Sequence, residues 1–143
     1  MRKITLTLII ALAAVTAFAG GFSRDNDTEI VTDSTNNRMW QDSSTAGVGT
    51  YTRTEAFDYC AGLFMGGYND WRLPNINELR SIVNYGAYHP AAYTIFQNAA
   101  AEGYWSSTTS IPSGGSTGYY IDFEIGQAYS AFQSNGLHVR CVR

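Results

Sequence analysis

Two cysteines, Cys60 and Cys141, place the strongest constraint on the fold of this chain, because they are the only two in 143 residues. A bond between them would tie the end of the chain to its middle and close a loop of about 80 residues, worth about 4 kcal/mol in the chain-entropy model. An even pair in an exported protein favours a disulfide. The alternatives are two buried thiols or two metal ligands, although no third soft ligand stands at zinc spacing.

The first residues indicate export. Arg2 and Lys3 precede an apolar run over residues 4–18, and Ala17-Phe18-Ala19 fits a small-x-small cleavage site. We therefore expect a signal peptide over residues 1–19 and one mature domain over residues 20–143. The mature protein would be periplasmic, secreted or on the surface of a bacterium. No other stretch has the ~20 apolar residues of a membrane span.

The charge of the mature chain argues against nucleic acid as a partner. Residues 20–143 hold seven arginines, no lysine and twelve acidic residues, a formal charge of −5. A nucleic-acid-binding domain is expected to carry a basic stripe instead. The chain is rich in Tyr, Ser, Gly and Asn, a composition typical of extracellular β-rich surfaces, and its aromatic rings can pack internally or stack on a ligand.

The middle of the chain predicts two helices. In "TRTEAFDYCAGLF" apolar residues recur at helical spacing, and we expect Thr54 to be the N-cap. After Gly66-Gly67, the short extended piece "DWRL" precedes Pro74. Asn75 then caps a second helix, with Glu78 three residues on in a capping-box-like pattern.

The rest of the chain predicts β-structure. A hairpin is expected around residues 30–40, and in "YYIDFEIG" the apolar residues Ile121, Phe123 and Ile125 alternate with acidic ones, so one face is buried. Asn135-Gly136 signals a hairpin into a last strand, "LHVRCVR". Alternation there predicts that Leu137, Val139 and Cys141 face inward and that His138 and Arg140 face outward. The fold class is α+β, with two helices packed on an antiparallel sheet.

Several segments together resemble one family. These are "VTDSTNNRMWQD", "TRTEAFDYCAGLFMGGYNDWRLPNINELRSIV", "YWSST", "YYIDFEIG" and "VRCVR". In this order they are similar to the Lcl C-terminal domain family, named for the C-terminal domain of a collagen-like bacterial adhesin. The resemblance implies a C-type-lectin-like fold, often tied to surface attachment, with a cysteine of the first helix bonded to one of the final strand. Cys60 and Cys141 match these positions.

The chain departs from the family in two ways. Asn37-Arg38 stands where the family usually has Gly-Leu before Met-Trp. The chain has no collagen-like repeats, so trimerisation does not carry over.

A calcium-dependent sugar site is not expected. Such sites use Glu-Pro-Asn or Gln-Pro-Asp with a downstream Trp-Asn-Asp, because calcium needs several oxygen ligands. Here Leu73 precedes Pro74-Asn75 and offers no oxygen, and the order is Asn-Asp-Trp. Asp25, Asp27 and Glu29 could hold calcium, but a solvated acidic segment explains them better. We predict no metal and no cofactor.

Catalysis is not expected either. The only histidines are His89 and His138, no nucleophile elbow is present, and a disulfide would leave no free thiol. An envelope enzyme would instead show a deep pocket where one of these histidines meets carboxylates.

The late strands and their loops carry the predicted ligand surface, because related folds build theirs there. Tyr offers contact area at low entropy cost, and Ser and Asn offer adaptable hydrogen bonds. The predicted site residues are Tyr119, Tyr120, Asp122, Tyr129, Gln133, Asn135 and His138, with Ser106, Ser107 and Thr108 nearby. We assign Trp40, Trp71, Arg72, Leu73 and Trp105 to the scaffold.

The sequence therefore predicts a secreted, non-enzymatic module for surface adhesion, or for recognition of a glycan or protein ligand at the cell surface, independent of metal. The alternative is a structural or assembly subunit of an envelope or appendage complex, which would show a large exposed apolar patch. Sulfated glycans would be repelled by the acidic charge unless arginines cluster; the candidates are Arg38, Arg53, Arg140 and Arg143.

Overall fold

The computed structural model describes residues 21–111 and 114–143, and the predicted signal peptide lies outside them. The elements are β1 (Phe22–Asp25), β2 (Ile30–Asp33), β3 (Arg38–Gln41), α1 (Arg53–Ala61), α2 (Ile76–Arg80), β4 (Gly103–Ser110), β5 (Thr117–Asp122) and β6 (Gln127–Phe132). No helix in this part of the chain is long and apolar enough to cross a membrane.

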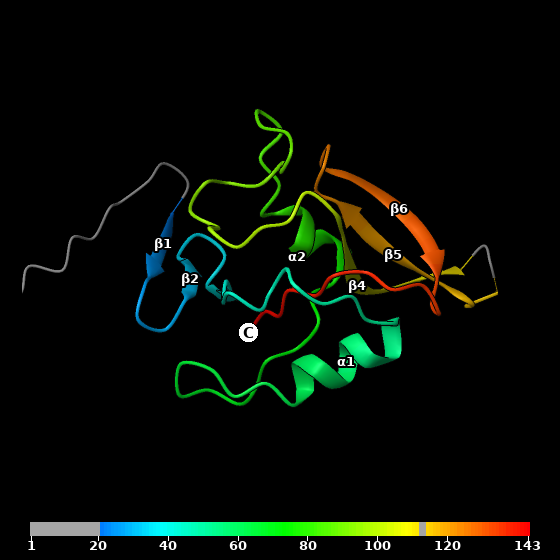
Figure 1. Ribbon diagram of the computed structural model, residues 1–143, viewed down its shortest axis with the longest axis horizontal. Helices are drawn as coiled ribbons and strands as arrows, with labels where there is room; N and C mark the ends of the chain where they lie inside the picture. The colour runs from blue at the N-terminus through cyan, green and yellow to red at the C-terminus, as the bar shows by residue number, and fades with distance from the viewer. Residues whose placement is uncertain (1–20, 112–113) are drawn as a thin grey trace, which may run out of the picture.

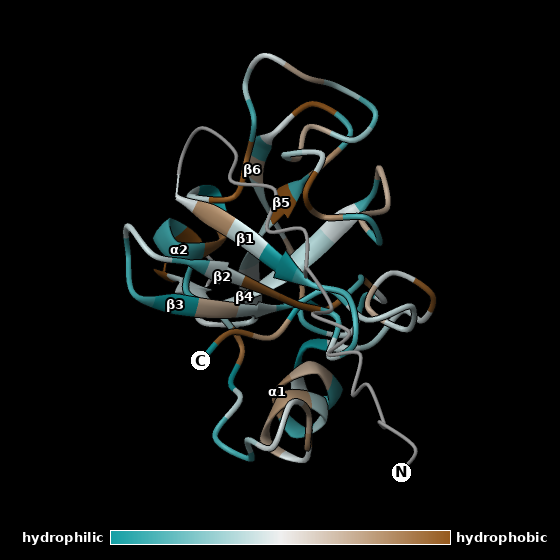
Figure 2. Ribbon diagram, turned by 90° about the vertical axis from the view of Figure 1, so that its left-hand side faces the viewer, coloured by the Kyte–Doolittle hydropathy of each residue, from teal (hydrophilic) through white to brown (hydrophobic). Residues whose placement is uncertain are grey.

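The strands form two antiparallel sheets, β1-β2-β3 and β4-β5-β6. The two sheets lie toward opposite ends of the molecule, with α1 below them in the view of Figure 1. Figure 2 shows β1, β2 and β3 as neighbours across the front. The predicted α+β class is confirmed, but the sheet structure is divided in two.

The C-terminal segment joins the two sheets. Val142 forms bridges with Trp40 of β3 and with Arg72, while His138 forms a parallel bridge with Tyr104 of β4. Residues 137–143 therefore contact both sheets through isolated bridges instead of forming the regular strand that was predicted. The disulfide between Cys60 of α1 and Cys141 is present, which confirms that prediction and excludes the two alternatives.

Both helices begin at capping boxes. The predicted N-cap Thr54 is wrong: Thr52 is the N-cap, since its Oγ1 accepts the Glu55 amide at 3.4 Å and the Glu55 carboxylate accepts the Thr52 amide at 2.8 Å. In α2 the predicted box is confirmed. The Glu78 amide donates to Asn75 Oδ1, and the Asn75 amide donates to Glu78 Oε1, both at 2.9 Å.

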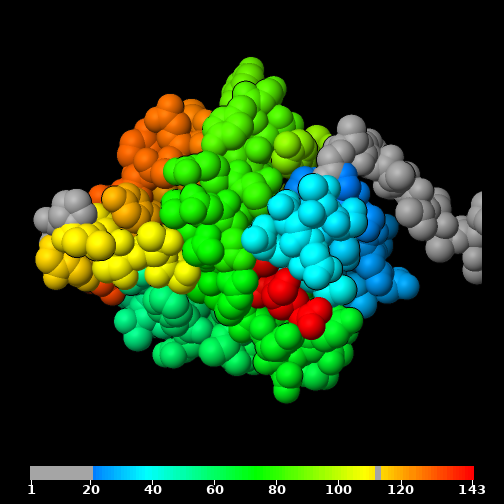
Figure 3. Space-filling view, turned by 180° about the vertical axis from the view of Figure 1, so that it is seen from behind, coloured from blue at the N-terminus to red at the C-terminus, as the bar shows by residue number. Residues whose placement is uncertain are grey.

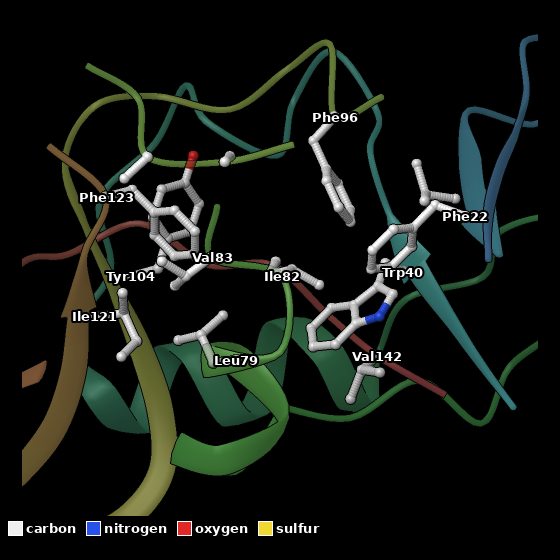
Figure 4. Close-up of a cluster of buried hydrophobic side chains, with 13 residues drawn as sticks. Phe22, Trp40, Leu79, Ile82, Val83, Phe96, Tyr104, Ile121, Phe123 and Val142 are labelled. Atoms are coloured by element: carbon white, nitrogen blue, oxygen red, sulfur yellow. The ribbon is translucent and has the colours of Figure 1, made fainter. Parts of the chain in front are cut away.

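Two apolar clusters form the core, and the predicted scaffold tryptophans belong to them. Figure 4 shows the first cluster, in which Trp40 lies near Val142 and the Tyr104 ring packs edge-on against Phe123. The second cluster surrounds the disulfide and contains Trp71, Leu73 and Trp105. Four apolar residues were assigned to the scaffold from the sequence, and each is 3% exposed or less: Trp40, Trp71, Leu73 and Trp105.

The alternation of buried and exposed residues predicted for "YYIDFEIG" does not extend to Ile125. Ile121 and Phe123 are buried, but Ile125 is 48% exposed. The strand stops at Asp122 and the chain turns over residues 123–126, so the alternation no longer applies. Gly126 closes this turn at φ +77°, where a Cβ would lie 2.6 Å from Val83 Cγ1.

The outward orientation predicted for Arg140 is also wrong. Its side chain is 2% exposed, and Nη1 donates to Asp42 Oδ1 at 2.8 Å. Arg24 Nε donates to Asp42 Oδ2 at 2.7 Å, and the amides of Gln97 and Asn98 also reach this carboxylate. Asp42 itself is fully buried. A buried charge is tolerated only when paired and hydrogen-bonded, and this network supplies both.

Candidate functional site

The register of β5 and β6 brings three of the predicted site residues onto one face. Tyr120 lies directly opposite Tyr129, and Asp122 lies opposite Gln127. Because alternate residues of a strand share a face, all four side chains lie on the same side of the sheet. We call Tyr120, Asp122, Gln127 and Tyr129 the tyrosine surface.

The two rings of the tyrosine surface form a pair. Their centroids are 5.9 Å apart with an interplanar angle of 36°, and Tyr120 also meets Trp105 edge-on. Tyr129 is 41% exposed, and its hydroxyl donates to Gln127 Oε1 at 3.0 Å. Gly103 makes room for the Tyr120 ring, because a Cβ there would lie 3.0 Å from two ring carbons. The Tyr120 ring thus packs on the core, and the Tyr129 ring is exposed to solvent.

The electrostatics of this surface favour a neutral phenol beside an anion. Partial burial raises the pKa of Tyr120, and the neighbouring Asp122 and Tyr129 raise it further. Tyr120 therefore keeps its proton at any physiological pH and can act as a hydrogen-bond donor or acceptor. The Asp122 carboxylate is half-buried, and its Oδ1 accepts the Glu124 amide at 2.9 Å.

Arg53 closes one end of this face. Its guanidinium crosses Gly118, where a Cβ would lie 2.4 Å from Arg53 Cδ and Nε. Nε donates to the Ser106 carbonyl at 3.2 Å and Nη2 to the Ser107 carbonyl at 2.6 Å. Burial lowers the pKa of Arg53. No local pattern in the sequence indicates this contact, which joins α1 to β4 and β5.

The other predicted site residues lie elsewhere. Tyr119 is on the opposite face of β5, across from Ser130. Gln133 Nε2 donates to the Gly115 carbonyl, so it fastens the loop before β5. Asn135 is exposed in the turn after β6, and its amide donates to the Phe132 carbonyl at 2.9 Å.

The polar residues of β4 also serve the fold. Ser106 Oγ donates to the Tyr119 carbonyl at 2.7 Å, and the Ser107 amide donates to the Pro74 carbonyl at 2.8 Å. Thr108 Oγ1 accepts the Ile76 amide at 3.0 Å, which satisfies the first turn of α2. All three are thus engaged within the protein.

His138 does not face outward as predicted. It is half-buried, Nδ1 lies 2.9 Å from the Gly49 carbonyl, and its ring packs 5.4 Å from that of Tyr104. His89 lies at the surface, with Nδ1 3.9 Å from Glu124 Oε1. The two histidines are therefore in different settings, and neither joins the tyrosine surface.

The arginines that could have formed a basic patch are either buried or paired with carboxylates. Arg38 and Arg72 both bind Glu78, and Arg72 is the main cause that lowers the Glu78 pKa to about 2. Arg143 binds Asp70 and stacks on Tyr68 with its guanidinium 3.6 Å from the ring centroid. Arg53 and Arg140 are buried, and Arg38 and Arg143 line one groove, where Glu78 and Asp70 offset their charges.

One groove lies in a region assigned to scaffold from the sequence. It has a volume of about 380 Å³ and is lined by Phe57, Asp58, Ala61, Trp71, Arg72, Leu73 and Ser107. Its wall combines α1 with the piece between the helices, so no local pattern could reveal it.

The acidic segment near the start serves a turn. Asp25 Oδ1 accepts the Asp27 and Thr28 amides at 2.8 and 3.3 Å, and these bonds lower the pKa of Asp25. In the part of the chain that the structure describes, no three His, Cys, Asp or Glu residues gather as metal ligands would.

Comparison with protein-family models gives a match over most of the chain. The family model described as the Lcl C-terminal domain matches residues 29–143, which includes both sheets except β1, both helices and the disulfide. No curated protein matches the sequence.

Proposed function

The chain belongs to the Lcl C-terminal domain family, and on that premise we propose that it is an exported, non-enzymatic module for adhesion or recognition at a bacterial cell surface. Its ligand is a neutral glycan, bound without a metal ion by the tyrosine surface. The observation that carries this proposal is the exposed Tyr129 ring, paired with Tyr120 and bordered by a carboxylate and an amide.

The fold we propose is C-type-lectin-like. Three features support it: the disulfide from α1 to the last residues, the bridge between β3 and Val142, and the late three-stranded sheet that carries exposed rings. In this arrangement the end of the chain lies beside an early strand, and the late strands are free to present a ligand surface.

Sugar recognition needs a flat apolar surface and nearby hydrogen-bonding groups. The Tyr129 ring supplies the first, since aromatic rings combine an apolar body with a polar tip. Asp122 and Gln127 supply the second, as the few polar groups that fix orientation in a binding site. The same carboxylate disfavours sulfated sugars, and Arg38 and Arg143, which could have attracted them, are paired with Glu78 and Asp70.

A glycan array tests the proposal. The purified protein is applied with calcium and, separately, with a chelator. We expect a selective signal for neutral glycans that the chelator does not change, that Tyr129→Ala abolishes, and that Tyr88→Ala retains. Tyr88 is the matched control because it is an exposed tyrosine, at 83%, that belongs to neither β5 nor β6. A signal lost with the chelator, or unchanged in Tyr129→Ala, would contradict the proposed site.

A second candidate function is an assembly subunit of an envelope or appendage complex. It is favoured by exposed side chains near the β5–β6 turn, where Tyr85 and Ile125 are 69% and 48% exposed. The His89 amide donates to the Glu124 carbonyl at 2.9 Å, which holds the two loops together. This function predicts capture of a protein partner that Tyr85→Ser weakens, and no glycan signal.

A further inference from the structure

The outer strand of the late sheet is uncovered. The strands of this sheet lie in the order β4-β5-β6, so β4 and β6 are its two edges. The C-terminal segment covers the β4 edge, where the Trp105 amide donates to the His138 carbonyl at 3.0 Å. β6 pairs with β5 alone among the described strands, and it lies at the periphery in Figure 3 (orange). Such an edge presents backbone groups that can pair with another chain.

The register identifies the backbone groups on this edge. The Gln133 amide donates to the Ser116 carbonyl, which is in register with the β5–β6 pairs. Hydrogen-bonded pairs alternate along this register, so β6 residues with odd numbers direct their backbone groups toward β5. Because this direction alternates along an antiparallel strand, Ala128, Ser130 and Phe132 direct theirs outward. Of these outward groups, the Phe132 carbonyl accepts the Asn135 amide of its own chain.

The edge lacks the usual protection against pairing. Natural edge strands carry charges, prolines or bulges. Residues 125–137 contain no charged residue and no proline, and the register with β5 is continuous over all six residues of β6. The edge of the other sheet, β1, has four residues and carries Arg24 and Asp25.

We propose that β6 pairs antiparallel with β6 of a second copy, about a two-fold axis at Ser130, to form one continuous six-stranded sheet. The side chains are self-complementary in this register. Ala128 lies opposite Phe132 on one face and Tyr129 lies opposite Ala131 on the other, so each ring meets a methyl group. The two-fold axis makes each of these contacts twice.

Charge also favours a second copy as the occupant. Two acidic copies repel where their charged residues meet, but this edge brings only neutral side chains together. Phe132 and Tyr129, which are 64% and 41% exposed in the single chain, would each lose part of this exposure on the side that meets the second copy. Pairing along this edge therefore brings no like charges into direct contact.

The dimer has a consequence for recognition, which rests on the proposed function, whereas the dimer itself rests on the edge alone. The two tyrosine surfaces would lie on the same face of the joined sheet, one on each side of the axis. Two sites on a rigid support bind a repeated ligand with avidity, because the second contact becomes intramolecular.

Sedimentation equilibrium of the purified protein tests the dimer. We expect twice the monomer mass at high concentration, and the monomer mass for Ser130→Lys, which places two like charges opposite each other. Ser134→Lys adds the same charge in the exposed turn after β6 and should keep the dimer. Circular dichroism confirms that each variant is folded. A wild-type protein that stays monomeric, or a Ser130→Lys variant that stays dimeric, would overturn the proposal.

A cysteine at the axis tests the register. Directly opposed residues of a hydrogen-bonded pair have Cα atoms about 5.5 Å apart, which a disulfide can span. Ser130→Cys should therefore form a covalent dimer on mild oxidation, and Ser134→Cys should not. Equal crosslinking of both variants would exclude this register. Glycan binding by the Ser130→Lys monomer would show that the proposed function holds even where the dimer fails.

Discussion

The two sheets differ in how they treat polar groups. At the β1–β2–β3 sheet, charged side chains are buried: Arg24 and Arg140 enclose Asp42, which is fully inaccessible to solvent. On the β4–β5–β6 sheet, neutral rings are exposed, as Tyr129 and Phe132 show. The first arrangement depends on partners from distant parts of the chain, and the second depends on the register of one hairpin and its packing on β4.

This difference separates stability from recognition. The Asp42 network connects β1, the residues after β3, the loop around residue 98 and the C-terminal segment, so a change there should loosen several segments together. The tyrosine surface belongs to two strands whose pairing does not need its exposed side chains. Substitutions at the first sheet should therefore unfold the protein, and those at the second should alter binding.

The largest effect is expected from Asp42→Asn. It leaves two buried arginines without their carboxylate and should lower the free energy of unfolding by about 3–5 kcal/mol. The matched change Asp122→Asn, on the other sheet, should cost under about 0.5 kcal/mol, because such surface changes rarely cost more. Urea denaturation followed by tryptophan fluorescence measures both. Similar losses in the two variants would remove the contrast between the sheets.

Glu78→Gln should have the next largest effect, and it should depend on pH. The Arg72 and Arg38 guanidinium groups hold the pKa of Glu78 near 2, below its ordinary 4.5, so the carboxylate stabilises the fold fully above pH 4.5 and loses this contribution as pH falls toward 2. The variant should be about 2–3 kcal/mol less stable at pH 7. Gln can still occupy the capping box.

The pH profile of this difference is the decisive measurement. Thermal denaturation of the wild type and of Glu78→Gln should give curves that converge as pH approaches 2. A constant difference from pH 7 to pH 2 would mean that lost packing, and not lost charge, destabilises the variant.

Gly118→Ala tests whether the late sheet also has a sensitive position. Its new Cβ would lie 2.4 Å from the Arg53 side chain, and such overpacking costs about 1–3 kcal/mol. The clash disappears if Arg53 is shortened, so Arg53→Ala with Gly118→Ala should be no less stable than Arg53→Ala alone. A double-mutant cycle by urea denaturation measures this coupling. Additive losses would contradict the contact.

Local patterns predicted the elements that depend on neighbours in sequence. The α2 capping box and the inward residues Ile121 and Phe123 follow from spacing, and the structure has them. Alternation failed for Arg140, because residues 137–143 do not form a regular strand and the partner Asp42 is 98 residues away. It failed for Ile125 because the strand had already ended.

The candidate site shows the same limit. Sequence reasoning selected the late strands but could not say that Tyr120, Asp122 and Tyr129 share a face while Tyr119 lies on the other. That outcome depends on the β5–β6 register, which the turn over residues 123–126 sets. His138 was expected to be exposed, but its ring meets Tyr104, a contact that only the path of the C-terminal segment creates.

The smallest effect on stability, and the largest on binding, is expected from Tyr129→Ala. Its ring is held by Tyr120 and by Gln127, both on the same hairpin, so its loss should cost less than about 1 kcal/mol of stability. Stacking on the proposed glycan would be lost, while Tyr129→Phe keeps the ring and should retain most of the affinity. Calorimetry with the best array ligand, together with thermal denaturation, separates the two effects. If Tyr129→Phe binds as weakly as Tyr129→Ala, the hydroxyl and not the ring is the recognition element, and the ligand is held by hydrogen bonds.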